Sequence, residues 1–494
     1  MTDDDTAPAA PDAELTVDVI VLGGGPVGEN VAQYATEGTD LTAAIVEGEL
    51  LGGECSYYAC IPSKALLRPL AVADAAAHLP GISRPPLDRD ALLARRDAWV
   101  SRYDDSGQVS WAEGAGLQVV RGHGRIVGER EVLVEGPEGT EGPAGRTRLR
   151  ARRAVVIATG STPTVPPPLR DLAPWTSRDA TGVREVPGEL VIIGGGVVAV
   201  EAATWMAALG SRVTLLVRGS SLLTGLEPFA GEHVRDALQE LGVEIRFGAT
   251  AVAGEREGAV PTGPGRELGR LHGGRVRLEI EADDGRETVE ADEVLVATGR
   301  RPRLDDVGLG TIGLSAEDTA PGAPLPEWLH AVGDASGEAP LTHWGKYRAR
   351  VIGQAIRAGA SGEVLEPVPE EVPVPQVVFT DPQVTAVGLT ESAAQEAGHD
   401  VVTAQVPFGG AAGSSLLRDD VTGTAQIVVD RGSGMLLGAT FVGPDASELL
   451  HAATVAIVGG VPVHVLRHAV PSFPSASELW LRLLEELPRE LRAG

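Results

Sequence analysis

The two cysteines of the chain, Cys55 and Cys60, are the residues whose type and spacing are best suited to redox chemistry. In a continuous helix, residues five apart have Cα atoms about 8–9 Å apart, whereas a disulfide needs less than about 7 Å. The backbone between them must therefore leave the helix if the thiols are to form a reducible bond. Zinc would need further ligands, and no other cysteine or histidine stands close by. We favour a redox pair over two ordinary buried thiols, and we expect no metal site.

The residues after Cys60 favour a thiolate at that position. Pro62 is typical of the first turn of a helix, and Lys64 and the apolar residues after it continue one. Cys60 is then expected just before a helix N-terminus with Lys64 nearby. The helix dipole and the ammonium group both stabilise a thiolate.

A glycine-rich loop near the N-terminus predicts dinucleotide binding. The strand-like run 17–22 leads into Gly23, Gly25 and Gly28, followed by a helix and a second strand that ends at Glu47. Glycines let backbone N–H groups at a helix N-terminus approach a pyrophosphate, and an acid after the second strand suits a ribose.

The same pattern recurs in the middle of the chain. The run 190–193 leads into Gly194 and Gly196, followed by a helix and a strand over 213–217. Because two such units occur in full strand–loop–helix–strand context, we expect two nucleotide-binding domains.

The remaining chain adds strands that end in turn residues and a separate C-terminal region. Such strands are expected at 155–160, 294–299 and 331–334, and the stretch 251–290 is typical of a hairpin region with a loop insertion. A linker rich in proline and glutamate over 366–375 marks a boundary. Beyond it, alternating patterns at 424–429 and 436–442 predict an antiparallel sheet with flanking helices.

Length and charge restrict the class of protein. A chain of 494 residues with 43% hydrophobic residues is expected to form two to four globular domains. The net charge of −28 disfavours nucleic acid or an anionic membrane surface as a partner. No apolar run reaches the roughly 18 residues of a membrane helix, and the acidic N-terminus does not resemble a signal peptide. We therefore expect a cytoplasmic protein with no membrane insertion.

The segment 52–64 resembles the redox motif of the class I pyridine nucleotide–disulfide oxidoreductases, which include dihydrolipoamide dehydrogenase, glutathione reductase and mercuric reductase. Their motif is G-G-x-C-x-x-x-G-C-x-P-S/T-K, and this sequence departs from it at Ala59 and in the bulky Tyr57 and Tyr58. The resemblance spans nearly the whole chain. It includes the segments 158–160, 297–300, 333–334, 379–382 and 387–391.

The resemblance implies an α/β fold with two Rossmann-like domains, one for FAD and one for NAD(P), and a C-terminal α+β dimerisation domain. We expect a disordered tail over 1–14, an FAD domain over 15–163 and 299–365, an NAD(P) domain over 164–298 and a dimerisation domain over 370–494. A homodimer follows from the same resemblance.

The resemblance also assigns roles to individual residues. Cys60 is expected as the thiolate beside the flavin, Cys55 as the outer thiol that meets the substrate, and Lys64 as a residue near the flavin that pairs with Glu201. Without the resemblance, Glu201 could equally be a helix-surface acid. The residues expected to bind FAD or the nicotinamide nucleotide are Gly23, Gly25, Gly28, Glu47, Lys64, Thr159, Gly160, Gly194, Gly196, Arg218, Gly299 and Asp334.

The end of the strand at 213–217 favours NADPH over NADH. An acid there marks NADH in this family, whereas here Val217 is followed by Arg218. A guanidinium can pair with a 2′-phosphate that a carboxylate would repel. A second arginine is usual six residues later, but Thr224 stands there.

The C-terminal motif of such reductases, H-P-T-x-x-E, is altered. Glu478 is present, but Phe473 occupies the position of the histidine that protonates the leaving thiol. General acid–base catalysis is typically worth about 10²–10⁴-fold, and a benzyl ring cannot move a proton. His464 and His468, a few residues upstream, are interpreted as ordinary histidines rather than substitute acids.

Three functions remain open from the sequence. The first is a disulfide reductase resembling dihydrolipoamide dehydrogenase, with an altered proton path. The second is a reductase of quinones or other small acceptors, favoured because Phe473 and the two tyrosines make the expected substrate face more apolar. The third is a redox-sensing or scaffolding flavoprotein. The absence of further cysteines argues against thioredoxin-reductase-like and standard mercuric reductase activities.

Overall fold

The fold is described from a computed structural model that covers residues 13–136, 145–282, 285–365, 367–369 and 371–493. The chain forms two compact units. The first contains Met1–Cys60, Val100–Thr162 and Arg300–Val368, and the second contains Ile61–Trp99, Pro163–Gly299 and Pro369–Gly494.

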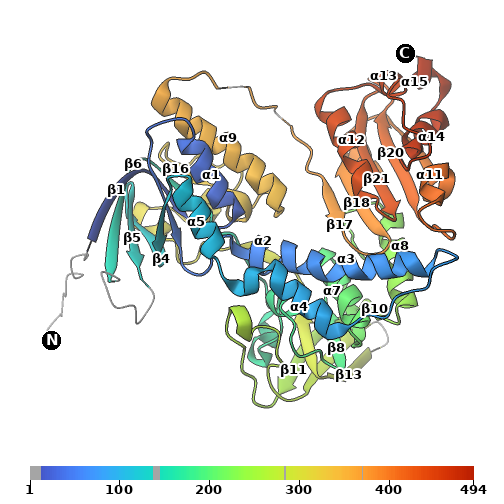
Figure 1. Cartoon of the computed structure of the whole chain (residues 1–494), viewed down its shortest axis with the longest axis horizontal. Coiled ribbons are helices and arrows are strands. Elements are labelled where there is room, and N and C mark those ends of the chain that lie inside the picture. The colour runs from blue at the N-terminus through green and yellow to red at the C-terminus, as the bar shows by residue number, and fades with distance from the viewer. Residues whose placement is uncertain (1–12, 137–144, 283–284, 366, 370, 494) are drawn as a thin grey trace. The chain divides into compact units, whose positions relative to one another are not determined.

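The first unit is built on a seven-stranded sheet in the order β3-β2-β1-β6-β5-β4, with β16 also paired to β6 (Figure 1). Its strands are β1 (Ala13–Leu22), β2 (Ala43–Glu47), β3 (Gln118–Arg121), β4 (His123–Gly128), β5 (Glu131–Glu135), β6 (Arg146–Ile157) and β16 (Leu329–Ala331). Helix α1 (Pro26–Thr36) packs against α9 (Thr342–Ser361), and α5 (Ser106–Gly114) packs against β3. The apolar run of β1 is buried on both faces, as is typical of a parallel sheet covered by helices.

The N-terminal boundary corrects one expectation. Residues 1–12 of the predicted tail lie outside the described residues, but Ala13 and Glu14 belong to β1 and lie in register with Thr147 and Arg148 of β6. The tail prediction extended too far because backbone pairing with β6 continues past the end of the apolar run.

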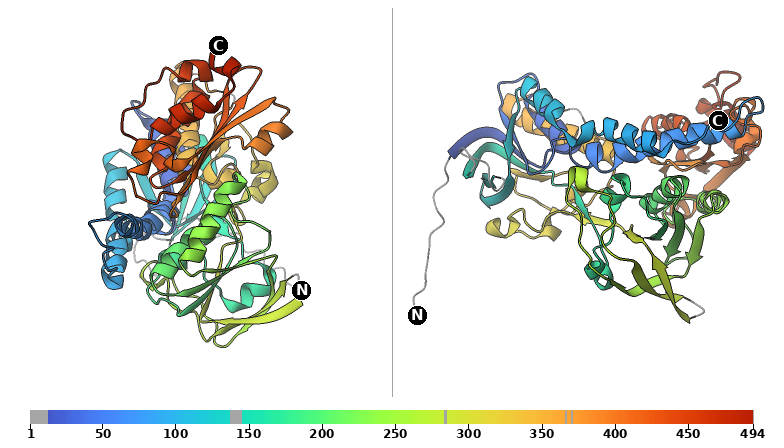
Figure 2. Two further views of the ribbon diagram at one scale, coloured as in Figure 1. Left: turned by 90° about the vertical axis from the view of Figure 1, so that its right-hand side faces the viewer. Right: turned by 60° about the horizontal axis from the view of Figure 1, so that its bottom comes forward.

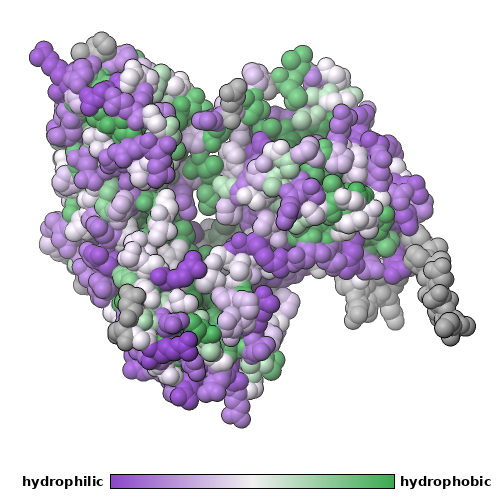
Figure 3. All heavy atoms as spheres, turned by 180° about the vertical axis from the view of Figure 1, so that it is seen from behind, coloured by the Kyte–Doolittle hydropathy of each residue, from purple (hydrophilic) through white to green (hydrophobic). Residues whose placement is uncertain are grey.

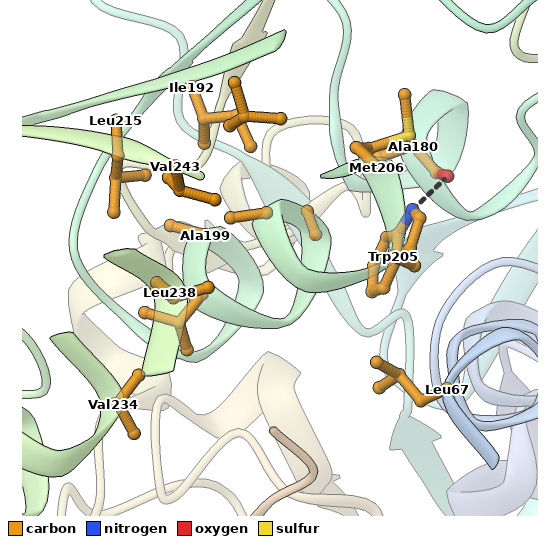
Figure 4. Packing of buried hydrophobic residues seen from close by; sticks show 14 of the residues in the cluster. Leu67, Ala180, Ile192, Ala199, Trp205, Met206, Leu215, Val234, Leu238 and Val243 are labelled. Carbon is orange, nitrogen blue, oxygen red and sulfur yellow. Dashed lines mark hydrogen bonds between the residues drawn. The ribbon is translucent and has the colours of Figure 1, made fainter. Parts of the chain in front are cut away.

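The second unit contains a parallel sheet of β10 (Glu244–Phe247), β9 (Arg212–Val217), β8 (Glu189–Ile193) and β14 (Glu293–Val296), in that order. Its core surrounds helix α7 (Val197–Ala208), where the indole of Trp205 is buried and donates a hydrogen bond of 3.1 Å to the carbonyl of Ala180 (Figure 4). Helices α3 (Cys60–Ala77, in this unit from Ile61), α4 (Arg89–Trp99) and α8 (Pro228–Glu240) complete this part.

A second, antiparallel sheet accompanies the parallel one (Figure 2). It consists of β11 (Thr250–Arg256), β12 (Val276–Ala282) and β13 (Gly285–Ala291), so the stretch predicted as a hairpin region is three-stranded. An insertion over 257–275 separates the first two strands.

The C-terminal part of the second unit contains the predicted antiparallel sheet. Five strands follow the order β17-β18-β21-β20-β19: β17 (Gln376–Val378), β18 (Gln383–Gly388), β21 (Leu436–Gly443), β20 (Thr424–Asp430) and β19 (Val401–Pro407). Helix α12 (Ser447–Val458) packs on β18 and β21, and α14 (Glu478–Glu486) packs on β19 and β20. The buried apolar residues of α14, Leu479, Trp480, Leu483 and Leu484, lie on one helical face.

The shorter elements connect these layers. They are α2 (Gly53–Tyr57), α6 (Ser177–Thr181), α10 (Glu391–Glu396), α11 (Ala412–Ser415), α13 (Val463–Leu466), α15 (Arg489–Ala493), β7 (Ser161–Pro163) and β15 (Arg300–Pro302). The predicted α/β fold class is confirmed.

The face shown in Figure 3 is mostly hydrophilic, with apolar side chains gathered in smaller patches. Among the residues that the structure describes, no helix combines the length and apolar character needed to cross a membrane.

Candidate redox and cofactor site

The cysteine pair lies where two helices meet in the chain. Cys55 belongs to the short helix α2, and α3 begins at Cys60. Tyr58, between them, has φ −129° and ψ −8°, so the backbone leaves the helix as the spacing requires. Both thiols are partly exposed.

The surroundings of the pair distinguish its two members. Cys55 shares a hydrogen bond with Cys60, and this bond together with burial raises the pKa of the Cys55 thiol. The Sγ atom of Cys60 lies 3.3 Å from Oγ1 of Thr342 at the start of α9. Because the two thiols are hydrogen-bonded to each other, they titrate as a coupled pair that can hold one proton between two sulfur atoms.

Lys64 and Glu201 form an ion pair in the second unit. Nζ of Lys64 lies 2.9 Å from Oε2 of Glu201 and 4.7 Å from the ring centre of Phe379. The N–H of Phe379 donates a 2.9 Å hydrogen bond to Oε1 of the same carboxylate, whose side chain is only 5% exposed. The pairing expected from the resemblance is therefore present in the structure.

The first glycine loop has the form required for close approach of a phosphate. A Cβ atom on Gly28 would lie 1.9 Å from the carbonyl oxygen of Gly23, and one on Gly53 would lie 2.7 Å from Cα of Gly25. The cysteine segment thus packs directly on the loop. Gly25 caps α1, and among the described residues only Cα of Gly53, 4.0 Å away, lies near the place of a Cβ, so the helix N-terminus is open to a ligand.

Glu47, at the end of β2, lies against this loop. Its carboxylate accepts a 2.8 Å hydrogen bond from the N–H of Gly24 and a 2.7 Å bond from the N–H of Glu49. Burial raises the pKa of Glu47, against the effect of these bonds. A carboxylate fixed beside the loop by backbone donors fits the ribose of an ADP group.

Asp334 belongs to a hydrogen-bonded chain on the same unit. Ser161 donates a 2.5 Å hydrogen bond to Asp334, and Arg300 donates from Nε to Oγ of Ser161 over 2.8 Å. Thr159 donates to the carbonyl of Arg303 over 2.6 Å, while Gly160 has a φ of +72° and nothing within 4 Å of a Cβ position. The residues expected to bind FAD in this unit therefore lie on a connected set of loops, and they fit that group.

Glu29 is a carboxylate that the sequence analysis missed. It lies in the first turn of α1, and burial raises its pKa to about 7 although the Lys346 charge opposes this. Its buried Oε1 atom has no hydrogen-bond partner among the described residues. The amphipathic pattern of α1 gave no signal of this, because burial here depends on packing between distant segments.

The second glycine loop precedes α7. Gly196 caps that helix with open space around its Cβ position, whereas a Cβ on Gly194 would lie 2.3 Å from the carbonyl oxygen of Ala297. Gly299 has a φ of +118° and follows β14. Arg218 directly follows β9, is exposed, and has no ion-pair or hydrogen-bond partner within the described part of the chain. Its guanidinium is therefore available at the end of the strand that contacts this loop.

The two tyrosines between the cysteines correct an expectation. Tyr57 and Tyr58 are 1% and 2% exposed, so they do not form an apolar substrate face. Their hydroxyl groups donate to Gln108 and Glu49, and the rings fill the interior of the first unit. Bulky apolar rings with polar ends are more stable buried with hydrogen-bond partners than exposed.

The altered C-terminal motif is exposed at Phe473 and buried at Glu478. The Phe473 side chain is 77% exposed, while Glu478 begins α14 and is 8% exposed. The buried Oε2 atom of Glu478 has no hydrogen-bond partner among the described residues. His468 is exposed and His464 is partly buried in α13. Glu478, the carboxylate that would orient a histidine, is thus present, but Phe473 stands at the position of that histidine.

Two glycine loops that each precede a helix, a cysteine pair and an ion pair between Lys64 and the buried Glu201 together define a class of flavin-dependent redox enzymes. The comparisons with known proteins agree. The sequence matches the pyridine nucleotide–disulphide oxidoreductase family over residues 17–345 and the dimerisation domain of that family over 374–483. The chain belongs to this family and is an FAD-dependent oxidoreductase that uses NAD(P)H. The dimerisation domain supports a homodimer.

Relatives and solved structures cover nearly the whole chain. A dihydrolipoyl dehydrogenase of Haloferax volcanii is 31% identical over 487 residues, which cover 96% of this chain and 97% of the relative. A mercuric reductase of Staphylococcus aureus is 28% identical, covering 93% of this chain and 80% of the relative. The HOCl-induced flavoprotein disulfide reductase RclA from Escherichia coli shares the fold, with a TM-score of 0.76 and 23% identity over 95% of this chain and all of that one.

Proposed function

We propose that the protein is an NADPH-dependent flavoprotein whose Cys55–Cys60 disulfide receives electrons by way of FAD. The single observation that carries this is the cysteine pair itself. Its thiols hydrogen-bond to each other on a segment that packs directly on the first glycine loop. When bound, FAD would supply hydride acceptance from the nicotinamide and two-electron transfer to the disulfide. Gly23, Gly25, Gly28, Glu47 and Asp334 would hold it.

The two cysteines would divide the chemistry. Cys60 at the N-terminus of α3 would be held as a thiolate by the helix dipole, with Thr342 as a hydrogen-bond neighbour. Cys55, whose pKa is raised by the hydrogen bond to Cys60 and by burial, would exchange with the acceptor. Lys64, fixed by Glu201, would place a positive charge near the flavin, as the family resemblance implies.

The exposed guanidinium of Arg218, which has no hydrogen-bond or ion-pair partner among the residues that the structure describes, supports a preference for NADPH. A cation at the end of β9 pairs with a 2′-phosphate, and no carboxylate replaces it there. Arg218→Ala should raise the KM for NADPH at least tenfold and that for NADH by less than twofold. Arg235→Ala, which removes a partly exposed arginine of α8 that pairs with Asp236, is the control. Equal effects of Arg218→Ala on both nucleotides would exclude this role.

Phe473 affects which electron acceptor the protein can reduce. Dihydrolipoyl dehydrogenase relatives suggest a disulfide or dithiol substrate. The exposed benzyl group at the position of the catalytic histidine favours a second candidate, reduction of quinones or similar small acceptors, because these need no acid to protonate a leaving thiol. A redox-sensing or scaffolding role remains the third hypothesis.

An acceptor screen tests the proposal. Turnover of NADPH would be measured with lipoamide, glutathione disulfide, a quinone and ferricyanide, in the wild type and in Cys55→Ser. Disulfide reduction should require Cys55. In the wild type, quinone reduction should be faster than disulfide reduction, and the Cys55→Ser variant should retain it. No NADPH oxidation with any acceptor by FAD-loaded protein would contradict the enzymatic proposal.

A further inference from the structure

The short segment that carries the two cysteines is held in the first unit by contacts of three side chains. Helix α2, which carries Cys55, has only five residues. An isolated helix of this length is not stable in water, so its position depends on contacts made by its side chains. Three residues next to the cysteines provide them: Glu54, Tyr57 and Tyr58.

The tyrosine contacts fix the turn from the interior. The Tyr58 hydroxyl donates a 2.5 Å hydrogen bond to Oε1 of Glu49, and its ring stacks on Tyr103 with centres 5.6 Å apart. The Tyr57 hydroxyl donates to Oε1 of Gln108 over 3.0 Å. Both rings are almost fully buried, so the turn cannot move without exposing them.

Glu54 fixes the other side. Its Oε1 atom lies 3.6 Å from a guanidinium nitrogen of Arg300 and 3.5 Å from one of Arg303. Arg300 is itself held by two 2.8 Å hydrogen bonds to the side chain and carbonyl of Ser161. The residue before Cys55 is thereby tied to the loop that also holds Asp334.

We propose that Glu54, Tyr57 and Tyr58 are positioning residues that hold the reduced cysteine pair in its disulfide-forming geometry and so make the disulfide harder to reduce. This inference rests on the proposed redox role of Cys55 and Cys60. A turn that is already ordered loses less conformational freedom when the S–S bond closes, so the effective concentration of one thiol at the other is higher.

The reduction potential of the pair provides the test. Full-length protein with FAD bound would be equilibrated anaerobically with graded ratios of reduced and oxidised dithiothreitol. Dithiothreitol gives up two electrons and two protons as it closes to its cyclic disulfide, and the Cys55–Cys60 bond breaks to two thiols. Acid quenching, alkylation and intact mass would count the free thiols at each ratio.

Tyr58→Phe and Glu54→Gln should each make the disulfide easier to reduce by about 3- to 10-fold, which is about 15–30 mV for a two-electron couple. Glu54→Asp, which keeps the charge, should recover part of the shift. Tyr34→Phe is the matched control, because Tyr34 lies on α1 of the same unit and its hydroxyl has no hydrogen-bond partner among the described residues. If Glu54→Gln fails to retain FAD, Glu49→Gln tests the same turn by removing the Tyr58 acceptor charge.

The outcomes separate this inference from the proposed function. Suppose that the wild-type disulfide forms and that the dithiothreitol ratio at half reduction in each variant lies within twofold of the wild-type ratio. This result would overturn the positioning role but would leave the redox role standing. A wild-type protein that forms no Cys55–Cys60 disulfide in fully oxidised buffer would overturn both.

Discussion

Phe473 is the residue at which this protein departs most from the chemistry of its family. Phe473→His should raise lipoamide or glutathione-disulfide turnover by up to about 10²-fold through general acid catalysis. The buried Oε2 atom of Glu478, which has no hydrogen-bond partner within the described part of the chain, is available to orient the new ring. Quinone turnover should change by less than twofold, and steady-state assays of both acceptors measure the difference. Wild-type disulfide turnover at rates that the substitution does not improve would show that another group supplies the proton, and His464 and His468 would be tested next.

Glu29 gives a pH-dependent prediction at the same scale. Burial raises its pKa in the folded state from 4.5 to about 7, so the folded protein binds this proton more tightly than the unfolded chain does. Stability contributed by the protonated group is complete below pH 4.5 and is lost as the pH rises to 7.

Glu29→Gln should therefore leave the free energy of unfolding unchanged at pH 4.5 and increase it by about 1–3 kcal/mol at pH 8. Urea unfolding at the two pH values measures this. Glu113→Gln, at an exposed position of α5, is the control and should have no effect at either pH. A gain that is equal at both pH values would contradict the role of ionisation.

At the scale of elements, the packing of α1 on β1 depends on a glycine that leaves no space for a side chain. A Cβ on Gly28 would lie 1.9 Å from the backbone of Gly23, so Gly28→Ala must displace the helix or the loop. We expect the free energy of unfolding to fall by about 1–3 kcal/mol. We also expect the variant to lose most of its FAD. Gly107→Ala on α5 should retain both, because no atom of the described residues lies within 4 Å of the place of its Cβ. Flavin absorbance per protein after gel filtration measures retention, and full retention by Gly28→Ala would show that the loop does not depend on this approach.

Some of the helices, strands and contacts could be predicted from local sequence patterns, and others could not. The apolar runs before each glycine loop predicted β1 and β8, and the alternating patterns predicted β20 and β21, because local hydrophobic periodicity is enough for such strands. The extension of β1 to Ala13 depends on pairing with β6, which is distant in sequence. The inward direction of Tyr57 and Tyr58 and the ties of Glu54 likewise depend on contacts with Gln108, Glu49 and Arg303. No pattern within the cysteine segment indicates those contacts.

For the whole molecule, the family's dimerisation domain implies that part of its exposed apolar surface is covered by a second copy. Val455 and Val458 lie one turn apart on α12 and are 56% and 49% exposed. Val455→Asp combined with Val458→Asp should weaken the homodimer at least tenfold, because the charges would be desolvated in the interface. Light scattering across a dilution series measures this. Val260→Asp, at a valine that is 66% exposed in the insertion over 257–275, is the control. A wild-type protein that is monomeric at micromolar concentration would contradict the assembly.

The proposed role of Cys60 as a thiolate next to a bound flavin is tested most directly by anaerobic titration with NADPH, followed by absorbance spectroscopy. Wild-type protein should be yellow and should gain a long-wavelength charge-transfer band after two-electron reduction. Cys60→Ser should keep FAD and lack the band, whereas Cys55→Ser should show the band before any NADPH is added, because Cys60 then has no disulfide partner. Protein that takes up no FAD, or a band that persists in Cys60→Ser, would contradict the account.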